Sequence, residues 1–282
     1  MNDVKKKLSD NAMLIEKALD EYYTFKEAPS LELIEAQRYA LLQGGKRIRA
    51  FLVLQTCELF GVDKVVALPY ACAIEMLHAS SLVHDDLPCM DNDDFRRGKP
   101  STHKMFDESI ALLAGDALMV KAFETIATNP HLPNSTNAIA VSILASSAGA
   151  YGMLAGQAVD LKASNEKLDL ETIHTLHNLK TARLVCASVK LGCLAAGVNE
   201  HDNRYNSLIN YANNIGLAFQ IIDDLLEYES GKKELNSFLS FMSAEEARAY
   251  SHKLTQNAIS EIQIIDNGTF EDLANHLIYR KY

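Results

Sequence analysis

Residues 82–103 read LVHDDLPCMDNDDFRRGKPSTH and place a cluster of aspartates at the end of an apolar helix. On a straight α-helix, residues six apart are rotated by about 600°, so Asp91 would lie roughly 120° away from Asp85. Pro88 disfavours continuing the helix and allows a turn that brings Asp91 back toward Asp85 and Asp86. The stretch therefore predicts a cup of carboxylates where the helix ends.

A second acidic cluster lies in FQIIDDLLE, residues 219–227. Asp223 and Glu227 are four residues apart, differ by about 40° around a helix and share one face, beside Asp224. Their neighbours are apolar, and like charges about 4 Å apart repel by about 4 kcal/mol at an effective dielectric near 20. A single pair of aspartates would more often cap a helix or face solvent. Two clusters on apolar helices instead predict a magnesium site completed by substrate phosphates.

Two runs of positive charge accompany the acids, GGKRIR at 44–49 and RRGK at 96–99. Arginine binds phosphate oxygens in a bidentate way, and lysine adds a mobile point charge. Either run alone could be a solvated surface. Next to two acidic clusters, they predict a site for a metal ion and a diphosphate.

The fold class follows from helical periodicity along the whole chain, with no competing strand pattern. All six prolines lie at or before Pro133, and no linker rich in Gly, Ser or Pro divides the sequence. We therefore predict one all-α domain over residues 1–282. The expected helices lie near 3–24, 31–43, 47–60, 64–87, 107–128, 135–162, 168–197, 203–229, 243–262 and 269–279.

Charge and cysteine usage restrict the class of protein. A formal net charge of −10 argues against a nucleic-acid partner, because a phosphate backbone is held mainly by Lys and Arg. The five cysteines form no CxxC pair, which favours reduced thiols and a cytoplasmic location. Residues 1–23 show no continuous apolar core, so we expect no export signal.

Residues 132–159 contain no formally charged side chain and are long enough to cross a membrane. They are also rich in Ser, Gly, Asn and Gln. We therefore predict a buried helix that packs closely against its neighbours, and no stable membrane insertion.

The chain resembles the trans-isoprenyl diphosphate synthases, the family that includes farnesyl and geranylgeranyl diphosphate synthases. The family's motifs occur in its order and spacing: GGKRIR, residues 82–103, LLAGDAL at 112–118, GQAVDL at 156–161, Lys180-Thr181 and FQIIDD at 219–224. The resemblance implies a helical bundle of the isoprenoid synthase type, with about ten or more helices around a central cavity, and a homodimer. The implied activity is the condensation of isopentenyl diphosphate with allylic diphosphates to farnesyl or geranylgeranyl diphosphate.

The resemblance also implies a role for each matching residue. The ligands of about three magnesium ions would be Asp85, Asp86, Asp91, Asp223, Asp224 and Glu227. Isopentenyl diphosphate would be bound by Lys46, Arg49, His78 and Arg97. Arg96 and Lys180 would hold the allylic diphosphate, while Thr181 and Gln220 face the reacting carbons. Outside the motif context, His78 would be interpreted as a core histidine.

Product length is set in this family by the residues just before the first aspartate cluster. A bulky aromatic residue five positions before the first Asp often closes the pocket at fifteen carbons, whereas this chain has Ser80, followed by Ser81. The resemblance therefore predicts growth to the twenty-carbon product, and predicts that Ser80→Tyr shortens it.

The chain departs from the family pattern after Asp224. A closing loop rich in Gly and Lys is replaced by YESGKKELNSFLSFMSAEEAR at 228–248, about a dozen residues shorter. Leu235 falls where a helix-start lysine belongs, so Lys232 or Lys233 would have to substitute. Two alternatives follow: a weakly active or non-catalytic paralogue that binds diphosphates as a regulatory subunit, and a terpene cyclase. The GGKRIR run and the DDxxE form of the second cluster favour the synthase.

Overall fold

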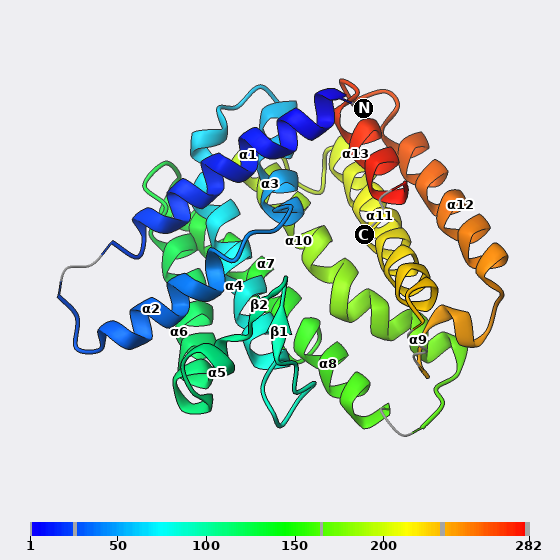
Figure 1. Ribbon diagram of the computed structural model, residues 1–282. Coiled ribbons are helices and arrows are strands. Elements are labelled where there is room, and N and C mark those ends of the chain that lie inside the picture. Colours follow the sequence, from blue (N-terminus) through cyan, green and yellow to red (C-terminus); the bar gives the residue numbers. More distant parts are fainter. Residues whose placement is uncertain (1, 25–26, 164–165, 232–234, 280–282) are drawn as a thin grey trace.

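The computed structural model describes residues 2–24, 27–163, 166–231 and 235–279, and it is almost entirely helical (Figure 1). The first half contains α1 (Asn2–Glu21), α2 (Leu31–Leu41), α3 (Ile48–Leu59), η1 (Lys64–Val66), α4 (Leu68–Asp85), β1 (Phe95–Arg96), β2 (Lys99–Pro100), α5 (Thr102–Met105) and α6 (Glu108–Ala127). The second half contains α7 (Asn134–Ala148), α8 (Met153–Lys162), α9 (Leu170–His177), η3 (Asn178–Ala182), α10 (Arg183–Ala195), α11 (Asn203–Glu229), η4 (Phe238–Ser240), α12 (Ala244–Ile262) and α13 (Thr269–Ile278). The predicted all-α class is confirmed.

Several helices begin at side chains that accept hydrogen bonds from the exposed first-turn N–H groups. Ser30 accepts from the Leu33 N–H at 3.2 Å before α2. Before α12, Ser243 and Glu246 form a reciprocal capping box. These caps explain why breaks in the sequence pattern coincide with the starts of helices.

The first and last helices of the described chain, α1 and α13, lie side by side. Figure 1 shows the start of α1 beside α13, and the Lys7 Nζ donates to Thr269 Oγ1 at 2.9 Å. The same picture shows α10 in the interior, with α11 and α12 along one side and α4 and α6 toward the other. Residues far apart in sequence therefore surround a common interior.

The core is built mainly from aliphatic side chains and includes two fully buried tyrosines. Tyr70 on α4 donates to Asn137 Oδ1 at 2.7 Å, and Tyr211 on α11 donates to the Phe270 carbonyl at 2.8 Å. Both tyrosines are fully buried. Their hydroxyls are satisfied, so the aromatic rings contribute burial without an unpaired polar group.

The structure differs from the predicted helices at several places, including one break and one hairpin. The helix expected over 135–162 is broken between α7 and α8, and the turn between them is so tight that a Cβ at Gly152 would lie 2.1 Å from the Ser147 carbonyl oxygen. A short β-hairpin, β1 paired antiparallel with β2, was not predicted. Two-residue strands are too short for a periodicity signal.

The apolar stretch expected to form a buried helix is buried on one face. Asn134–Lys162 passes a test for a membrane span on length and composition alone, with a mean hydropathy of 1.6. One third of its most apolar window is buried in the fold, 33%. The buried side includes Asn137, Ala140 and Leu144, whereas Ile139 is 53% exposed. The expectation of a buried helix therefore holds for part of the segment.

Candidate functional site

A cavity of about 970 Å³ is lined by residues of α3, α4, α6, α8, α10, α11 and α13 and of the loops before α3 and after α4. The predicted site residues on its wall are Lys46, Arg49, His78, Ser81, Asp85, Asp91, Arg96, Arg97, Lys180, Thr181, Gln220, Asp223 and Glu227. Ser80, Asp86 and Asp224 are not on that wall. Most of the residues that the sequence singled out are thus brought together.

The first carboxylate cluster has the turn that Pro88 predicted. The helix α4 ends at Asp85, and the Asp91 N–H donates to the Asp85 carbonyl at 2.9 Å, so the chain folds back at this point. Burial raises the pKa of Asp85 to about 6, opposed by the charge of Lys180. Burial also raises the pKa of Asp91. Two carboxylates are therefore held in an environment that disfavours uncompensated negative charge.

Asp86 is directed to an arginine rather than to the cavity. Its side chain is 3% exposed and accepts from Arg96 Nε at 2.9 Å, with a second, short contact from the same guanidinium. Arg96 pairs with Lys99 in the hairpin, and the turn residues Arg97 and Gly98 have φ values of 53° and 76°. Two positive φ angles are typical of a type I′ turn. The hairpin thus fixes Arg96 beside the first cluster.

In the second carboxylate cluster, too, one aspartate lines the cavity while its neighbour is bound by other protein groups. Asp223 and Glu227 both line the cavity, as their helical spacing predicted. Asp224 is 4% exposed and accepts hydrogen bonds from Gln220 Nε2 at 3.1 Å and from the Phe238 N–H at 3.0 Å. Asp224 therefore connects α11 to the short segment that follows it.

The residues predicted to face the reacting carbons form one hydrogen-bonded pair. Thr181 Oγ1 donates to Gln220 Oε1 at 2.8 Å, from the π-helical segment η3 to α11. The neighbouring Lys180 Nζ donates to Asp160 Oδ2 at 2.6 Å. Burial disfavours the charge of Lys180, but Asp160 and the first cluster outweigh it and raise the lysine pKa. Local π-helical geometry often occurs at functional sites.

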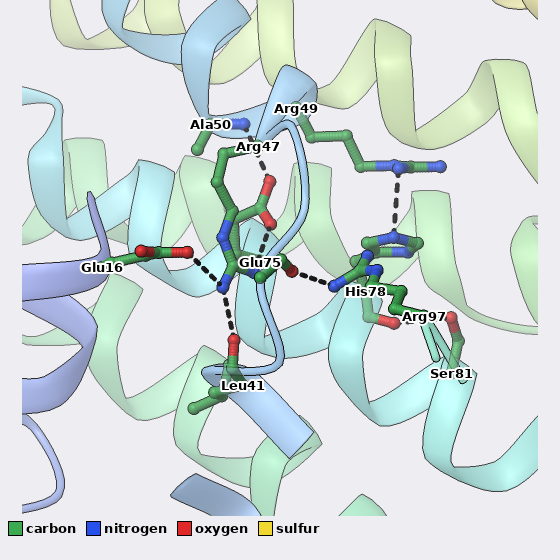
Figure 2. Close-up of polar contacts among 10 residues, drawn as sticks. Glu16, Leu41, Arg47, Arg49, Ala50, Glu75, His78, Ser81 and Arg97 are labelled. Carbon is green, nitrogen blue, oxygen red and sulfur yellow. Dashed lines mark hydrogen bonds and ion pairs between the residues drawn. The ribbon is translucent and has the colours of Figure 1, made fainter. Parts of the chain in front are cut away.

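The positive side of the cavity is built from the loop before α3, the first turn of α3, α4 and the turn of the β1–β2 hairpin (Figure 2). Arg49 Nη1 lies 3.3 Å from His78 Nε2. Burial and the nearby Arg49 hold the pKa of His78 well below its usual range, so this imidazole is neutral. Arg97 donates to the Gly44 carbonyl, and a Cβ at Gly45 would lie 2.9 Å from the Arg97 guanidinium. Gly45 also has a φ of 129°, which residues with a side chain rarely adopt, so the backbone here favours glycine.

Two buried residues of this region were not predicted from the sequence. Arg47 adopts a left-handed conformation, with φ of 49°, and its guanidinium lies beside the Glu75 carboxylate. The run GGKRIR gave a signal for cations but none for their individual orientations. Glu75 lies in an apolar helix, where a lone glutamate could have been noticed.

The residues present fit a metal ion that is completed by substrate. Within the described ranges, no group of three His, Cys, Asp or Glu side chains is close enough to hold a metal ion alone. Asp85 and Asp91 line one part of the wall, and Asp223 and Glu227 another. Oxygen ligands from separate elements suit a divalent cation that retains water and bridges to phosphate oxygens.

The structure changes the interpretation of the two serines. Ser81 lines the cavity, whereas Ser80 is fully buried outside its lining, and its Oγ has no hydrogen-bond partner among the described residues. The wall of the same cavity also includes the apolar residues Leu112 and Met119, seven residues apart on one face of α6. Of the two serines predicted to control product length, Ser81 is therefore the one on the cavity wall, and the role of both in product length stays a prediction.

The short segment after α11 is anchored behind the site. Phe238 is fully buried and stacks on His177, with ring centroids 5.1 Å apart and an interplanar angle of 22°. His174 contacts the same ring edge-on at 4.8 Å. Lys232 and Lys233, the suggested replacements for the helix-start lysine, lie outside the described residues, and Leu235 is 47% exposed.

Burial of His177 predicts a pH-dependent stability. Burial lowers its pKa from 6.5 to about 4, so the folded state favours the neutral ring. Between these values the unfolded chain binds a proton that the folded chain does not. The contribution of neutral His177 to the free energy of unfolding is thus complete above about pH 6.5. It is lost as the pH falls toward 4, by about 3 kcal/mol in all. Urea titrations of the metal-free protein should show a weaker pH dependence for His177→Gln across this range. Equal slopes for both proteins would contradict the prediction.

The chain is similar to known proteins over most of its length. The polyprenyl synthetase family model matches residues 31–239. The chain is 41% identical over 293 residues to heterodimeric geranylgeranyl pyrophosphate synthase large subunit 1, chloroplastic, of Arabidopsis thaliana, covering 96% of this chain and 77% of that protein. It is 42% identical over 234 residues to farnesyl diphosphate synthase of Geobacillus stearothermophilus, and the match covers 82% of this chain and 78% of that protein. The crystal structure of an FPP/GFPP synthase from Zymomonas mobilis matches with a TM-score of 0.90 at 39% identity, covering 98% of this chain and 99% of that one.

Proposed function

Because the chain belongs to the polyprenyl synthetase family, we propose that its cavity condenses isopentenyl diphosphate with allylic diphosphates to farnesyl and geranylgeranyl diphosphate. The chain is a trans-prenyltransferase with the all-α fold of the isoprenoid synthases. The observation that carries the proposal is the convergence of Asp85 and Asp91, Asp223 and Glu227, and the cationic loop on one cavity. Neither the regulatory-subunit nor the terpene-cyclase alternative gains support from the comparisons.

The family uses a divalent metal for catalysis, and we propose magnesium as that metal here. Asp85, Asp91, Asp223 and Glu227 would hold it, because these carboxylates line the cavity. When bound, the metal supplies positive charge that stabilises the departing diphosphate. Asp86 and Asp224 would act on the substrate indirectly, because they bind and orient Arg96 and Gln220 respectively.

The chain's own side chains would divide the two substrates between them. Arg96 and Lys180 would bind the allylic diphosphate beside the acids. Isopentenyl diphosphate would be bound by Lys46, Arg49, His78 and Arg97. Heterolysis of the allylic C–O bond leaves a carbocation, and the Thr181–Gln220 pair presents oxygen dipoles toward it. The cation attacks the double bond of isopentenyl diphosphate, and the released diphosphate accepts the proton that is then lost. The apolar wall limits the access of water, which would otherwise capture the cation.

We propose a twenty-carbon product because the small Ser81 leaves room between α4 and α6. Ser81→Phe is expected to shift the product to farnesyl diphosphate, since an aromatic ring would fill the cavity at this point. Ser80→Phe is the matched control: it enlarges a side chain buried outside the cavity and should cost about 1–3 kcal/mol of stability without shortening the product. Chromatography of dephosphorylated products, with isopentenyl diphosphate in excess, measures both. A shift confined to the Ser80 variant would contradict this assignment.

We further propose a cytoplasmic homodimer without stable membrane insertion. The five cysteines are free, four of them buried, which agrees with a reducing compartment. Large apolar side chains are exposed on neighbouring helices, including Leu113 and Val120 on α6 and Ile139 on α7. A second copy covering this face would remove them from water. Sedimentation of the purified protein tests the dimer.

The activity is tested directly with purified protein, magnesium and isopentenyl diphosphate together with dimethylallyl, geranyl or farnesyl diphosphate as the starter. We expect chain elongation from at least one starter, and loss of elongation when EDTA removes the metal. Binding of diphosphates without turnover would overturn the proposed catalysis and favour the regulatory alternative. Cyclised hydrocarbons would favour the terpene cyclase.

A further inference from the structure

Arg47 lies between two cations that the proposed function assigns to isopentenyl diphosphate, yet its own guanidinium is bound by the protein. The side chain is 3% exposed. Its Nη1 lies 3.3 Å from Glu75 Oε2, and its Nη2 lies 3.3 Å from Glu16 Oε1 and also donates to the Leu41 carbonyl. Figure 2 shows these groups converging on Arg47 from α1, α2 and α4.

Glu75 joins this guanidinium to the start of α3. Its other oxygen, Oε1, accepts from the Ala50 N–H at 3.2 Å (Figure 2). Ala50 lies in the first turn of α3, where backbone N–H groups have no partner within the helix. One carboxylate on α4 therefore holds both the residue that precedes α3 and the first turn of α3 itself. Lys46 is the sequence neighbour of Arg47, and Arg49 is the sequence neighbour of Ala50, so Glu75 helps to fix the backbone on which both cations lie.

Glu75 is also the buried counter-charge of this positive cluster. Its side chain is 3% exposed. Burial lowers the pKa of Arg49 and of Arg97, and in both cases the charge of Glu75 opposes that effect. Without Glu75, several guanidinium groups would be buried close together with less compensation, which is costly in a low dielectric.

We propose that the Arg47–Glu75 ion pair is a positioning pair that sets the affinity for isopentenyl diphosphate by fixing the geometry of Lys46 and Arg49. Both residues border the cavity, but their charged groups are bound by protein partners, so the pair acts on the substrate through these two neighbours and takes no part in ionisation of the allylic substrate. This inference rests on the proposed function of the same site. It assigns a structural reason to the arginine that lies inside the run GGKRIR.

The test compares two glutamates that contact the same guanidinium at the same distance of 3.3 Å. Glu75→Gln removes the buried charge, whereas Glu16→Gln removes one whose side chain is 38% exposed. We expect Glu75→Gln to raise the KM for isopentenyl diphosphate about tenfold, while kcat and the KM for the allylic substrate change by less than about twofold. Glu16→Gln should leave all three within about twofold, because exposed pairs are weak.

A double variant separates positioning from folding. Arg47→Met with Glu75→Leu removes both buried charges together and so leaves neither one unpaired. The protein should remain folded by circular dichroism, while the KM for isopentenyl diphosphate stays raised. Arg47→Lys in the wild-type background keeps the charge and should recover part of the affinity that Arg47→Met loses.

The outcomes distinguish the two proposals. Wild-type turnover, with an unchanged KM for isopentenyl diphosphate in both Glu75→Gln and the double variant, would overturn the positioning pair alone. Parallel losses in kcat and in both KM values that follow the melting temperature would also overturn it, since they would indicate general destabilisation. Absence of turnover by the wild-type protein would overturn the proposed function itself.

Discussion

Asp85→Asn is expected to lower kcat on the order of 10³-fold, because an amide of the same size lacks the negative charge that holds a divalent metal against the diphosphate. The same change should not destabilise the metal-free protein. Burial raises the pKa of Asp85 to about 6, so the fold disfavours its charged form. We therefore expect an unchanged or higher melting temperature without metal, and a loss of the increase that magnesium and diphosphate produce. Steady-state kinetics and thermal melting measure the two effects.

Asp94→Asn is the matched control for this variant, from the same acidic stretch. Asp94 pairs with Lys104 at 2.9 Å, and its side chain is 59% exposed, so removing its charge should change kcat by less than about twofold. Comparable losses in both variants would indicate a general effect of charge on the mouth of the cavity. A destabilised Asp85→Asn protein would contradict the explanation from burial.

Sequence patterns predicted which segments are helical and where the acidic clusters lie, because periodicity and proline turns act locally. They could not separate Asp85 from Asp86, which differ by about 100° around α4. Tertiary packing makes that distinction: the β1–β2 hairpin brings Arg96 to Asp86 and leaves Asp85 on the cavity wall. The same limit applies to Ser80 and Ser81, one residue apart, of which the cavity is lined by the second.

The cationic loop shows a second reason why the sequence could not predict the role of each residue. Three of the residues in GGKRIR are positive, and charge alone does not distinguish them; the family resemblance gave roles to Lys46 and Arg49 but none to Arg47. The left-handed backbone at Arg47 and the buried carboxylate of Glu75 single out that residue. A left-handed conformation at an arginine is uncommon and follows from long-range contacts rather than from local preference. The roles within the run therefore depend on α1 and α4, which lie far from it in sequence.

Asp223→Asn and Asp224→Asn are expected to have different effects, although the residues are adjacent: the first should weaken the binding of metal, and the second should disturb the orientation of Gln220. Asp223 lines the cavity, and its loss should lower kcat on the order of 10²- to 10³-fold and reduce the stabilisation by magnesium and diphosphate. Asp224 instead accepts from both Gln220 and the Phe238 N–H. An asparagine there has one acceptor oxygen for two donors, so one bond is lost or Gln220 rotates its amide.

Rotation of Gln220 would reverse the Thr181–Gln220 hydrogen bond and turn an amide N–H toward the reacting carbons, where an oxygen dipole is needed. Asp224→Asn should therefore cost about 1–3 kcal/mol of unfolding free energy and lower kcat, yet keep the stabilisation by magnesium and diphosphate. In a double-mutant cycle with Gln220→Leu, the two losses in kcat should not add, because both act through the same amide. Additive losses, or a lost response to magnesium in Asp224→Asn, would show that Asp224 acts on the metal directly.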